Sequence, residues 1–260
     1  MRLLTFSFLK SCKYKKFCSV SRSISTVLQP EVLPAVGDPN LVEVSPSWKE
    51  SEEPALRSAV LRDMQVYPDF ISEREEAALL TEVEPVLRRM RYEFDHWDNA
   101  IHGFRETERR QWSPENSVVL ARVRALALGG AQAQALPHVH VLDLAAAGHI
   151  KPHIDAVRFC GDVIAGLCLA SSAVMQLVHN DKKHLELNAL LARRALYIMK
   201  GVARYEFTHA VLGGEHSTWR GARLPRLRRV ALICRTAPRP QDAQPGVQRG
   251  ALADPDAPAP

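Results

Sequence analysis

The second half of the chain consists of short apolar runs separated by turn signals. Six of these runs are rich in β-branched residues or alternate between apolar and polar positions, which is typical of strands buried on one or both faces. They span residues 138–144, 163–170, 173–179, 195–200, 204–207 and 229–234. Many short strands at this spacing predict a mainly β protein, a sandwich or barrel rather than a parallel α/β sheet.

Helical patterns lie ahead of these strands. Ser72 and Glu75 form a capping-box pattern before apolar residues at helical spacing, which predicts a helix start. Pro85 lies inside that pattern and predicts a kink or a break into two helices. A second helix is expected over residues 114–128, because its leading Pro suits a first helical turn and a Gly-Gly pair follows it. The strands are therefore expected to carry flanking helices.

The two ends of the chain have a different composition. Residues 1–30 contain six basic residues and no acidic one, as mitochondrial presequences do; a disordered basic tail is the alternative. Residues 31–63 are polar and contain Pro, which favours a linker. Residues 239–260 are rich in Pro, Ala and Gln and predict a disordered tail. The helical flank and the β-core are then expected to form one domain over residues 64–238.

Charge and cysteine content exclude several classes of protein. The net charge of +5 comes from the first thirty residues, because the remainder holds 28 basic and 29 acidic residues. The expected domain thus has no positive excess suited to a polyanion. No run of eighteen uncharged apolar residues occurs, which excludes a transmembrane helix. Cys160, Cys168 and Cys234 lie in apolar runs and are odd in number, so we expect buried thiols in a reducing compartment.

Two histidines and one aspartate form a candidate metal site. His153 and Asp155 follow a predicted strand, and His209 lies 54 residues after Asp155 in another apolar stretch. Two imidazoles and one carboxylate are the ligands of non-haem Fe(II) oxygenases, and they leave positions for a bidentate 2-oxo acid and O₂. A second His-x-Asp pair, His96 and Asp98, is interpreted as a surface or loop-packing histidine, since such pairs also arise by chance.

Two arginines on one predicted strand form a candidate anion site. Arg229 and Arg235 are six residues apart on an apolar stretch, hence on one face and about 20 Å apart along the backbone. A guanidinium pairs a carboxylate in bidentate fashion and is always charged, as a dicarboxylate co-substrate requires. The alternative is a surface arginine run, because four more arginines crowd the region: Arg220, Arg223, Arg226 and Arg228.

Taken together, these residues resemble the AlkB family of Fe(II)/2-oxoglutarate dioxygenases. The resemblance covers roughly residues 64–238 and rests on the candidate triad, the two arginines and the stretch GVARYEFTH. Two further stretches resemble the mitochondrial branch of the family, RYEFDHWDNAIHGFRETE at 91–108 and IKPHIDAVRFCG at 150–161.

The resemblance implies a double-stranded β-helix (jelly-roll) barrel with flanking helices, which uses Fe(II) and the co-substrates 2-oxoglutarate and O₂. It implies that iron is held by His153, Asp155 and His209. It also implies that Arg229 pairs with the distal carboxylate of 2-oxoglutarate and that Arg235 helps to order the co-substrate or the reacting group. Two further positions are implied to line the co-substrate pocket, Tyr197 and Ala231; the alternative for Tyr197 is an ordinary core aromatic.

The chain departs from the members of the family that act on nucleic acid. Those members carry Asn and Tyr where this chain has Leu142 and Leu144, and Asn where it has Ala231. The pocket is therefore expected to be more apolar. These changes favour hydroxylation of a protein side chain or a small metabolite in the mitochondrial matrix, and the resemblance implies a link to regulated necrosis and fatty acid metabolism.

Two other functions remain open from the sequence. One is removal of N-methyl groups from mitochondrial RNA, which requires a basic groove with stacking aromatics. Seven residues of the helical flank are candidates for such a groove: Tyr92, Phe94, Trp97, Phe104, Arg105, Arg109 and Arg110. The other is a non-catalytic protein that keeps the metal and acts through partner contacts.

Overall fold

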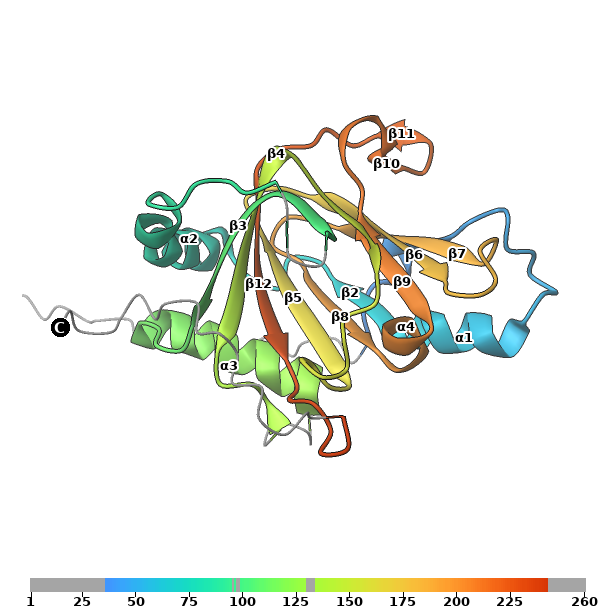
Figure 1. Cartoon of the computed structure of the whole chain (residues 1–260), viewed down its shortest axis with the longest axis horizontal. Helices are drawn as coiled ribbons and strands as arrows, with labels where there is room; N and C mark the ends of the chain where they lie inside the picture. The colour runs from blue at the N-terminus through green and yellow to red at the C-terminus, as the bar shows by residue number, and fades with distance from the viewer. Residues whose placement is uncertain (1–35, 95, 97–98, 130–133, 243–260) are drawn as a thin grey trace, which may run out of the picture. The chain divides into compact units, whose positions relative to one another are not determined.

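The strands form one large antiparallel sheet that curls toward closure (Figure 1). The computed structural model describes residues 36–242 except 95, 97–98 and 130–133. Strand order along the sheet is β1-β7-β6-β9-β4-β12-β5-β8-β2, with β3 paired to β4 outside this path. The two ends approach each other, since β2 contacts both β1 and β7. This arrangement confirms the prediction of a mainly β, barrel-like protein of the jelly-roll type.

The elements follow one another in this order: η1 (Pro39–Leu41), β1 (Val42–Val44), α1 (Pro54–Asp63), β2 (Met64–Tyr67), α2 (Glu73–Leu87), β3 (Ile101–Arg109), α3 (Pro114–Leu128), β4 (Val139–His153), β5 (Val163–Leu169), β6 (Ala173–His179), β7 (Glu186–Leu191), β8 (Leu196–Lys200), α4 (Gly201–Tyr205), β9 (Phe207–Val211), η3 (Gly214–His216), β10 (Thr218–Trp219), β11 (Ala222–Arg223) and β12 (Arg229–Arg235). Helices α2 and α3 pack on each other, with α2 against β3 and α3 against β5, whereas α1 packs on β2, β8 and α4.

Most predicted elements are present. The apolar runs at 163–170, 173–179, 195–200 and 229–234 form β5, β6, β8 and β12, and β4 extends the predicted strand at 138–144 as far as His153. The strand predicted at 204–207 is wrong, because residues 201–205 form the short helix α4 and β9 begins only at Phe207. The Arg204 side chain turns inward there and donates to the backbone carbonyls of Cys160 and Gly161.

Both predicted helices are confirmed. Ser72 and Glu75 close the capping box at the start of α2. Pro85 does not divide α2, because it lies in the last turn and the helix ends at Leu87. A proline removes the hydrogen bond from its own nitrogen to the carbonyl four residues before it, and here only two helical residues follow it, so a kink has little helix left to redirect.

The linker prediction for residues 31–63 is wrong from residue 39 onward. This stretch contains η1, β1 and α1. The Trp48 side chain is 2% exposed and stacks on Phe207 at a ring-centroid distance of 6.1 Å, and Val60 is fully buried. Trp48 and Val60 are thus buried side chains in a stretch whose other residues are mostly polar, which is why the sequence pattern favoured a linker. The predicted presequence at 1–30 lies outside the described residues, as does the predicted tail beyond residue 242.

The three cysteines of the expected domain are free and buried, as predicted. No helix among the described residues is both long and apolar enough to cross a membrane.

A buried carboxylate joins four segments on one face of β4. Asp143 is fully buried and accepts hydrogen bonds from Arg105 of β3 at 2.7 Å and from Arg228 at 2.8 Å. The Tyr92 hydroxyl donates to it at 3.2 Å, and Arg228 also pairs with Glu84 of α2. Because its partners come from separate elements, this one carboxylate holds β3, α2 and the chain entering β12 against β4.

We predict that Asp143→Ala lowers the free energy of unfolding by about 3–5 kcal/mol, because it leaves two guanidiniums in a buried site without their carboxylate. Denaturant unfolding of the purified protein measures this change. Arg74→Ala is the control, since Arg74 pairs with Glu115 at the surface, where the expected cost is below about 1 kcal/mol. Equal changes in the two variants would contradict the assignment.

Candidate metal centre

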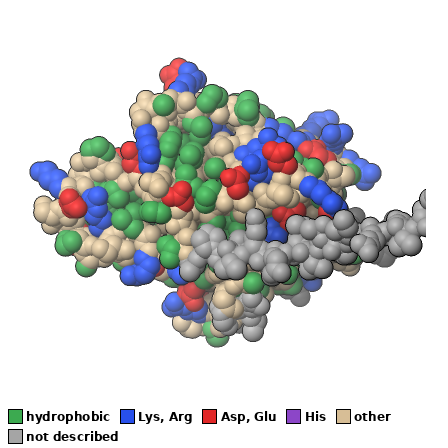
Figure 2. Space-filling view, turned by 180° about the vertical axis from the view of Figure 1, so that it is seen from behind, with side chains coloured by type: hydrophobic (Ala, Val, Ile, Leu, Met, Phe, Trp, Pro, Cys, Tyr) green, Lys and Arg blue, Asp and Glu red, His purple; other side chains and the backbone are tan. Residues whose placement is uncertain are grey.

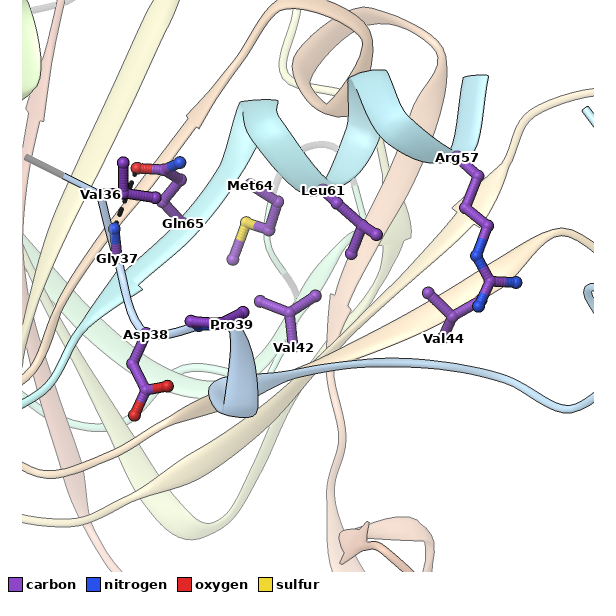
Figure 3. Close-up of a pocket in the computed structure, with 10 residues that line it drawn as sticks. All are labelled: Val36, Gly37, Asp38, Pro39, Val42, Val44, Arg57, Leu61, Met64 and Gln65. Atoms are coloured by element: carbon purple, nitrogen blue, oxygen red, sulfur yellow. Dashed lines mark hydrogen bonds between the residues drawn. The ribbon is translucent and has the colours of Figure 1, made fainter. Parts of the chain in front are cut away.

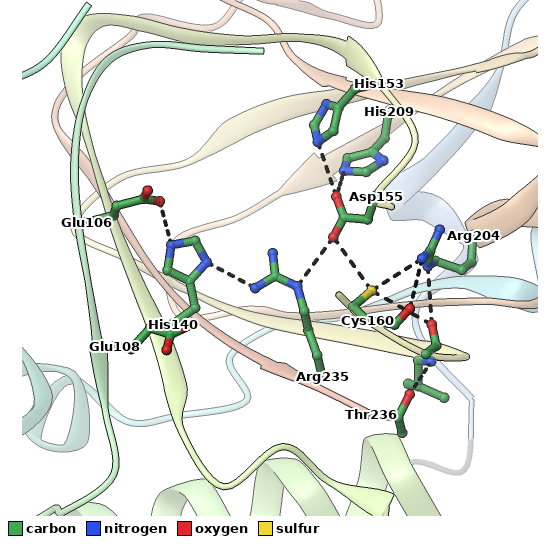
Figure 4. A network of polar contacts seen from close by, with 12 residues as sticks. Glu106, Glu108, His140, His153, Asp155, Cys160, Arg204, His209, Arg235 and Thr236 are labelled. Carbon is green, nitrogen blue, oxygen red and sulfur yellow. Dashed lines mark hydrogen bonds and ion pairs between the residues drawn. The ribbon is translucent and has the colours of Figure 1, made fainter. Parts of the chain in front are cut away.

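The three candidate ligands converge at the end of β4 (Figure 4). His153 is the last residue of β4 and lies directly opposite His209 of β9 in the antiparallel register. Asp155 follows two residues later. Its Oδ1 lies 3.2 Å from His153 Nε2 and 3.6 Å from His209 Nε2, and the three ligand atoms lie within 4.8 Å of one another. Strand pairing therefore brings together residues that are far apart in the chain.

Each imidazole points its Nε2 to this position. The His153 Nδ1 lies 2.9 Å from the backbone carbonyl of Lys151; since a carbonyl only accepts, Nδ1 carries a proton, and Nε2 is the nitrogen that could bind a metal. His209 is buried, and burial lowers its pKa to about 3, so this ring is neutral near pH 7. Neutral imidazoles are the form that binds metal ions.

The carboxylate is held in its ionised form. Burial alone would raise the pKa of Asp155, but its polar neighbours, the Arg235 guanidinium foremost, outweigh this effect and keep the pKa well below 3.8. Arg235 Nε lies 3.3 Å from Oδ2, the oxygen that faces away from the imidazoles. Two neutral nitrogens and one anionic oxygen thus point to one position, and this donor set fits a divalent iron.

Arg229 is a buried cation for which the described residues offer no acidic partner. It is 2% exposed, and no ion pair to it occurs among the described residues. Its Nε is buried and without a hydrogen-bond partner in the same part of the chain, and its Nη2 lies 3.5 Å from the Cys168 sulfur. A buried guanidinium is costly unless a charge pairs with it, so this position is suited to an anionic ligand.

The wall around Arg229 is apolar. Side chains alternate along β12, so Ala231 lies on the same face as Arg229 and Arg235. Ala231 is fully buried opposite Leu142, and Leu144 lies opposite Arg229 itself. Apolar side chains thus adjoin Arg229 along β4 and β12, and the co-substrate pocket itself stays a prediction.

Tyr197 lies in the barrel interior and is 5% exposed. It is paired with Gly166 across β5 and β8, and a Cβ on that glycine would come within 2.1 Å of the tyrosine ring. Gly166 therefore makes room for the ring. Burial raises the pKa of Tyr197 to about 12, which keeps the hydroxyl protonated as a donor.

The sequence analysis missed Arg226. Its Nη2 donates to the backbone carbonyl of Gly148 at 3.2 Å, but its Nε and Nη1 are buried with no partner among the described residues. Burial and the nearby charge of Arg229 lower its pKa to about 10. From the sequence, Arg226 was interpreted as part of a surface run with the neighbouring arginines. The path of the chain before β12 buries part of its guanidinium. A second cation, Arg226, therefore lies near Arg229.

Four of the seven residues predicted to form an RNA groove are engaged inside the protein. The Arg105 guanidinium stacks on the Tyr92 ring and pairs with Asp143, Phe104 is 2% exposed, and Arg109 pairs with Glu82. Phe94 is exposed, Arg110 is exposed at the end of β3, and Trp97 lies outside the described residues. His96 packs on Phe104 and lies 3.3 Å from Glu106, as expected for a loop-packing histidine.

One cavity lies apart from the three candidate ligands. A cavity of about 300 Å³ between η1, β1, α1 and β2 is lined mainly by apolar side chains such as Val42, Leu61 and Met64 and contains none of the predicted site residues (Figure 3). On the face shown in Figure 2, basic side chains are interspersed with acidic and apolar ones.

Comparisons with known proteins agree with the family resemblance seen in the sequence. No family model matches the chain. It is 47% identical over 205 residues to the alpha-ketoglutarate-dependent dioxygenase alkB homolog 7, mitochondrial, of Mus musculus, covering 76% of this chain and 92% of the mouse protein. It is 48% identical over 191 residues to the protein of the same name from Bos taurus, covering 74% and 86%.

Solved structures support the fold. The structure of OsALKBH1 superposes with a TM-score of 0.50 at 11% identity, covering 67% of this chain and 98% of that one. A Pseudomonas putida prolyl-4-hydroxylase gives a TM-score of 0.50 at 12% identity, covering 72% and 98%. At these identities the similarity concerns the barrel alone.

The buried state of His209 predicts an acid-sensitive fold. Its pKa falls from 6.5 to about 3, so between these values the unfolded chain binds a proton that the folded chain does not. The stabilisation is complete above pH 6.5 and is lost as the pH falls toward 3, by at most about 1.4 kcal/mol per pH unit. Urea unfolding of metal-free protein between pH 7 and pH 4.5 measures it.

In the same experiment, His209→Gln should show a shallower dependence on pH. His184→Gln should keep the wild-type slope, because His184 is a half-exposed residue of the β6–β7 connection. Identical slopes for all three proteins would show that His209 does not carry the effect.

Proposed function

Because this chain belongs to the alkB homolog 7 family of alpha-ketoglutarate-dependent dioxygenases, we propose that it works in the mitochondrial matrix and hydroxylates a protein side chain or a small metabolite with Fe(II), 2-oxoglutarate and O₂. One observation carries the proposal. Two imidazoles and a carboxylate meet at one point inside a barrel that also buries an arginine with no acidic partner in the described part of the chain.

The chemistry that the metal supplies when bound is O₂ activation: 2-oxoglutarate takes one oxygen atom and leaves as succinate and CO₂, and the substrate C–H takes the other as a hydroxyl. We assign metal binding to His153 Nε2, Asp155 Oδ1 and His209 Nε2. These atoms lie within 4.8 Å of one another, and three protein ligands would leave further positions of an iron ion for the co-substrates.

We assign co-substrate binding to the arginines of and before β12. Arg229 would pair with the distal carboxylate of 2-oxoglutarate, and Arg226 adds a second positive charge near it. Tyr197 would offer its hydroxyl to the same ligand. The apolar side chains of Leu142, Leu144 and Ala231 would exclude water, which strengthens the pairing of opposite charges. Arg235 would hold Asp155 in its ionised state and fixed orientation.

A protein or metabolite substrate is favoured over RNA by the fate of the aromatic and basic residues of the helical flank. Tyr92 and Arg105 belong to the Asp143 cluster, and Phe104 is buried. Few of the predicted groove residues are therefore available to stack a base or contact a phosphate. Regulated necrosis and fatty acid metabolism, which the resemblance implies, are the cellular settings in which we propose to look for the substrate.

We predict that His153→Ala, Asp155→Ala and His209→Ala each reduce Fe(II)-dependent conversion of 2-oxoglutarate to succinate by more than about a hundredfold, since even changes to groups behind the ligands cost 10–100-fold. Succinate release by the purified protein is the measurement, and His184→Ala is the control. A wild-type protein that neither binds iron nor forms succinate would refute the enzymatic proposal. Cellular function retained in His209→Ala would then support the non-catalytic alternative.

We predict that Arg229→Met raises the KM for 2-oxoglutarate at least about tenfold, because a hydrogen bond to a charged group contributes about 1.5–3 kcal/mol. Arg223→Met is the control, since Arg223 is an exposed member of the same arginine-rich region. Equal KM values in both variants would exclude Arg229 from the co-substrate site.

The substrate class is tested by succinate formation with panels of matrix peptides, metabolites and methylated RNAs. We expect stimulation by members of the first two panels. Salt-sensitive RNA binding together with formaldehyde release from methylated RNA would instead establish the demethylase alternative.

A further inference from the structure

The two oxygens of Asp155 face different partners (Figure 4). Oδ1 points to the imidazoles of His153 and His209. Oδ2 points away from them and accepts from Arg235 Nε at 3.3 Å, with the Cys160 sulfur at 3.8 Å. A carboxylate can bind a metal through one oxygen or through both. Here the Arg235 guanidinium occupies Oδ2, and Oδ1 is the oxygen that faces the imidazoles.

Arg235 is itself held from behind. Its Nη1 lies 3.0 Å from His140 Nδ1, and the opposite nitrogen of that ring, Nε2, lies 2.7 Å from Glu106 Oε2. A guanidinium only donates, so His140 Nδ1 must accept. The proton of the neutral ring then sits on Nε2 and is donated to Glu106. Hydrogen bonds are thus donated in one direction, from Arg235 to His140 and from His140 to Glu106.

Glu106 is fixed on both sides. Its second oxygen, Oε1, lies 3.3 Å from His96 Nε2. Burial tends to raise the pKa of Glu106, but the two imidazoles outweigh it and lower the pKa, so the carboxylate is ionised. The side chains of Glu106 and His140 are 17% and 14% exposed. A carboxylate this far buried orients an imidazole more firmly than one at the surface would.

We propose that Glu106 and His140 are positioning residues that lock the Arg235 guanidinium onto Oδ2 of Asp155 and so leave this carboxylate a single oxygen for the metal. The inference rests on the proposed function above. Loss of His140 would release one end of the guanidinium, and Asp155 could then turn both oxygens to the metal. That change would occupy a coordination position that 2-oxoglutarate or O₂ needs.

The same two strands provide a matched control pair. His138 of the chain entering β4 and Glu108 of β3 lie 3.1 Å apart, and His138 is as buried as His140. This pair repeats the His–Glu chemistry two residues along each strand, and the contacts of Arg235 given above involve His140 and Asp155 rather than His138. A change at His138 therefore reproduces the packing loss without releasing the guanidinium.

The first test uses metal-free protein with ¹⁵N-labelled histidine. We expect the NMR signals of His140 to show a neutral ring with the proton on Nε2. Glu106→Leu should destroy this fixed tautomer, whereas Glu108→Leu should leave it intact. A ring with its proton on Nδ1, or a signal indifferent to Glu106→Leu, would overturn the proposed chain of hydrogen bonds whether or not the protein is an enzyme.

The second test uses Mn(II) alone as the probe and counts the waters bound to it by water-proton relaxation. Wild-type protein and His138→Leu should keep about three waters, as expected for an octahedral ion with three single-atom protein ligands. His140→Leu should keep fewer and should bind Mn(II) with an affinity changed by about 10–100-fold. His140→Gln should restore the wild-type values, because an amide can accept from Arg235 and donate to Glu106.

The outcomes separate the two proposals. Wild-type binding of Mn(II) with the same water count and affinity in His140→Leu and His138→Leu would overturn the positioning role and leave the dioxygenase proposal intact. Failure of wild-type protein to bind Mn(II) and Fe(II) would overturn the dioxygenase proposal and, with it, the role of Oδ1.

Discussion

The antiparallel pairing of β4 with β9 is the constraint on which the candidate centre depends. His153 and His209 face each other only in the observed register. A slip of one residue would turn one imidazole to the opposite face of the sheet, because side chains alternate along a strand. The barrel stabilises this register by burying apolar side chains on both strands, so the hydrophobic core determines the geometry of the polar site.

The two faces of β4 divide structural from chemical roles. Asp143 points to one face and is neutralised there by Arg105 and Arg228, which tie the flanking elements to the sheet. Its neighbours Leu142 and Leu144 point to the other face, where they lie beside Ala231 and Arg229 of β12. The same strand can thus carry a compensated buried charge on one face and apolar side chains on the other.

The two arginines of β12 illustrate how burial separates two identical side chains. Arg235 has a carboxylate and an imidazole within reach, and its charge is balanced inside the protein. Arg229 has the Cys168 thiol and the cation Arg226 nearby and no carboxylate partner among the described residues. An uncompensated guanidinium in an apolar interior reduces stability unless a ligand supplies the missing charge. This difference is the basis of our proposal that Arg229 binds the co-substrate and that Arg235 positions Asp155.

The sequence by itself determined the main features of this protein. Apolar runs identified five of the ten strands that the structure describes in the large sheet, because burial on both faces requires continuous hydrophobic stretches, and the residue types of His153, Asp155 and His209 carried the metal chemistry. It could not reveal β3, whose charged residues face other polar side chains, or the buried anchors Trp48 and Val60 in a polar segment. Only the tertiary structure decided that Arg226 is buried and that Glu106, His140 and Arg235 form a chain behind Asp155. These contacts join different strands, and their distances follow from register and sheet curvature, which no local pattern of residues encodes.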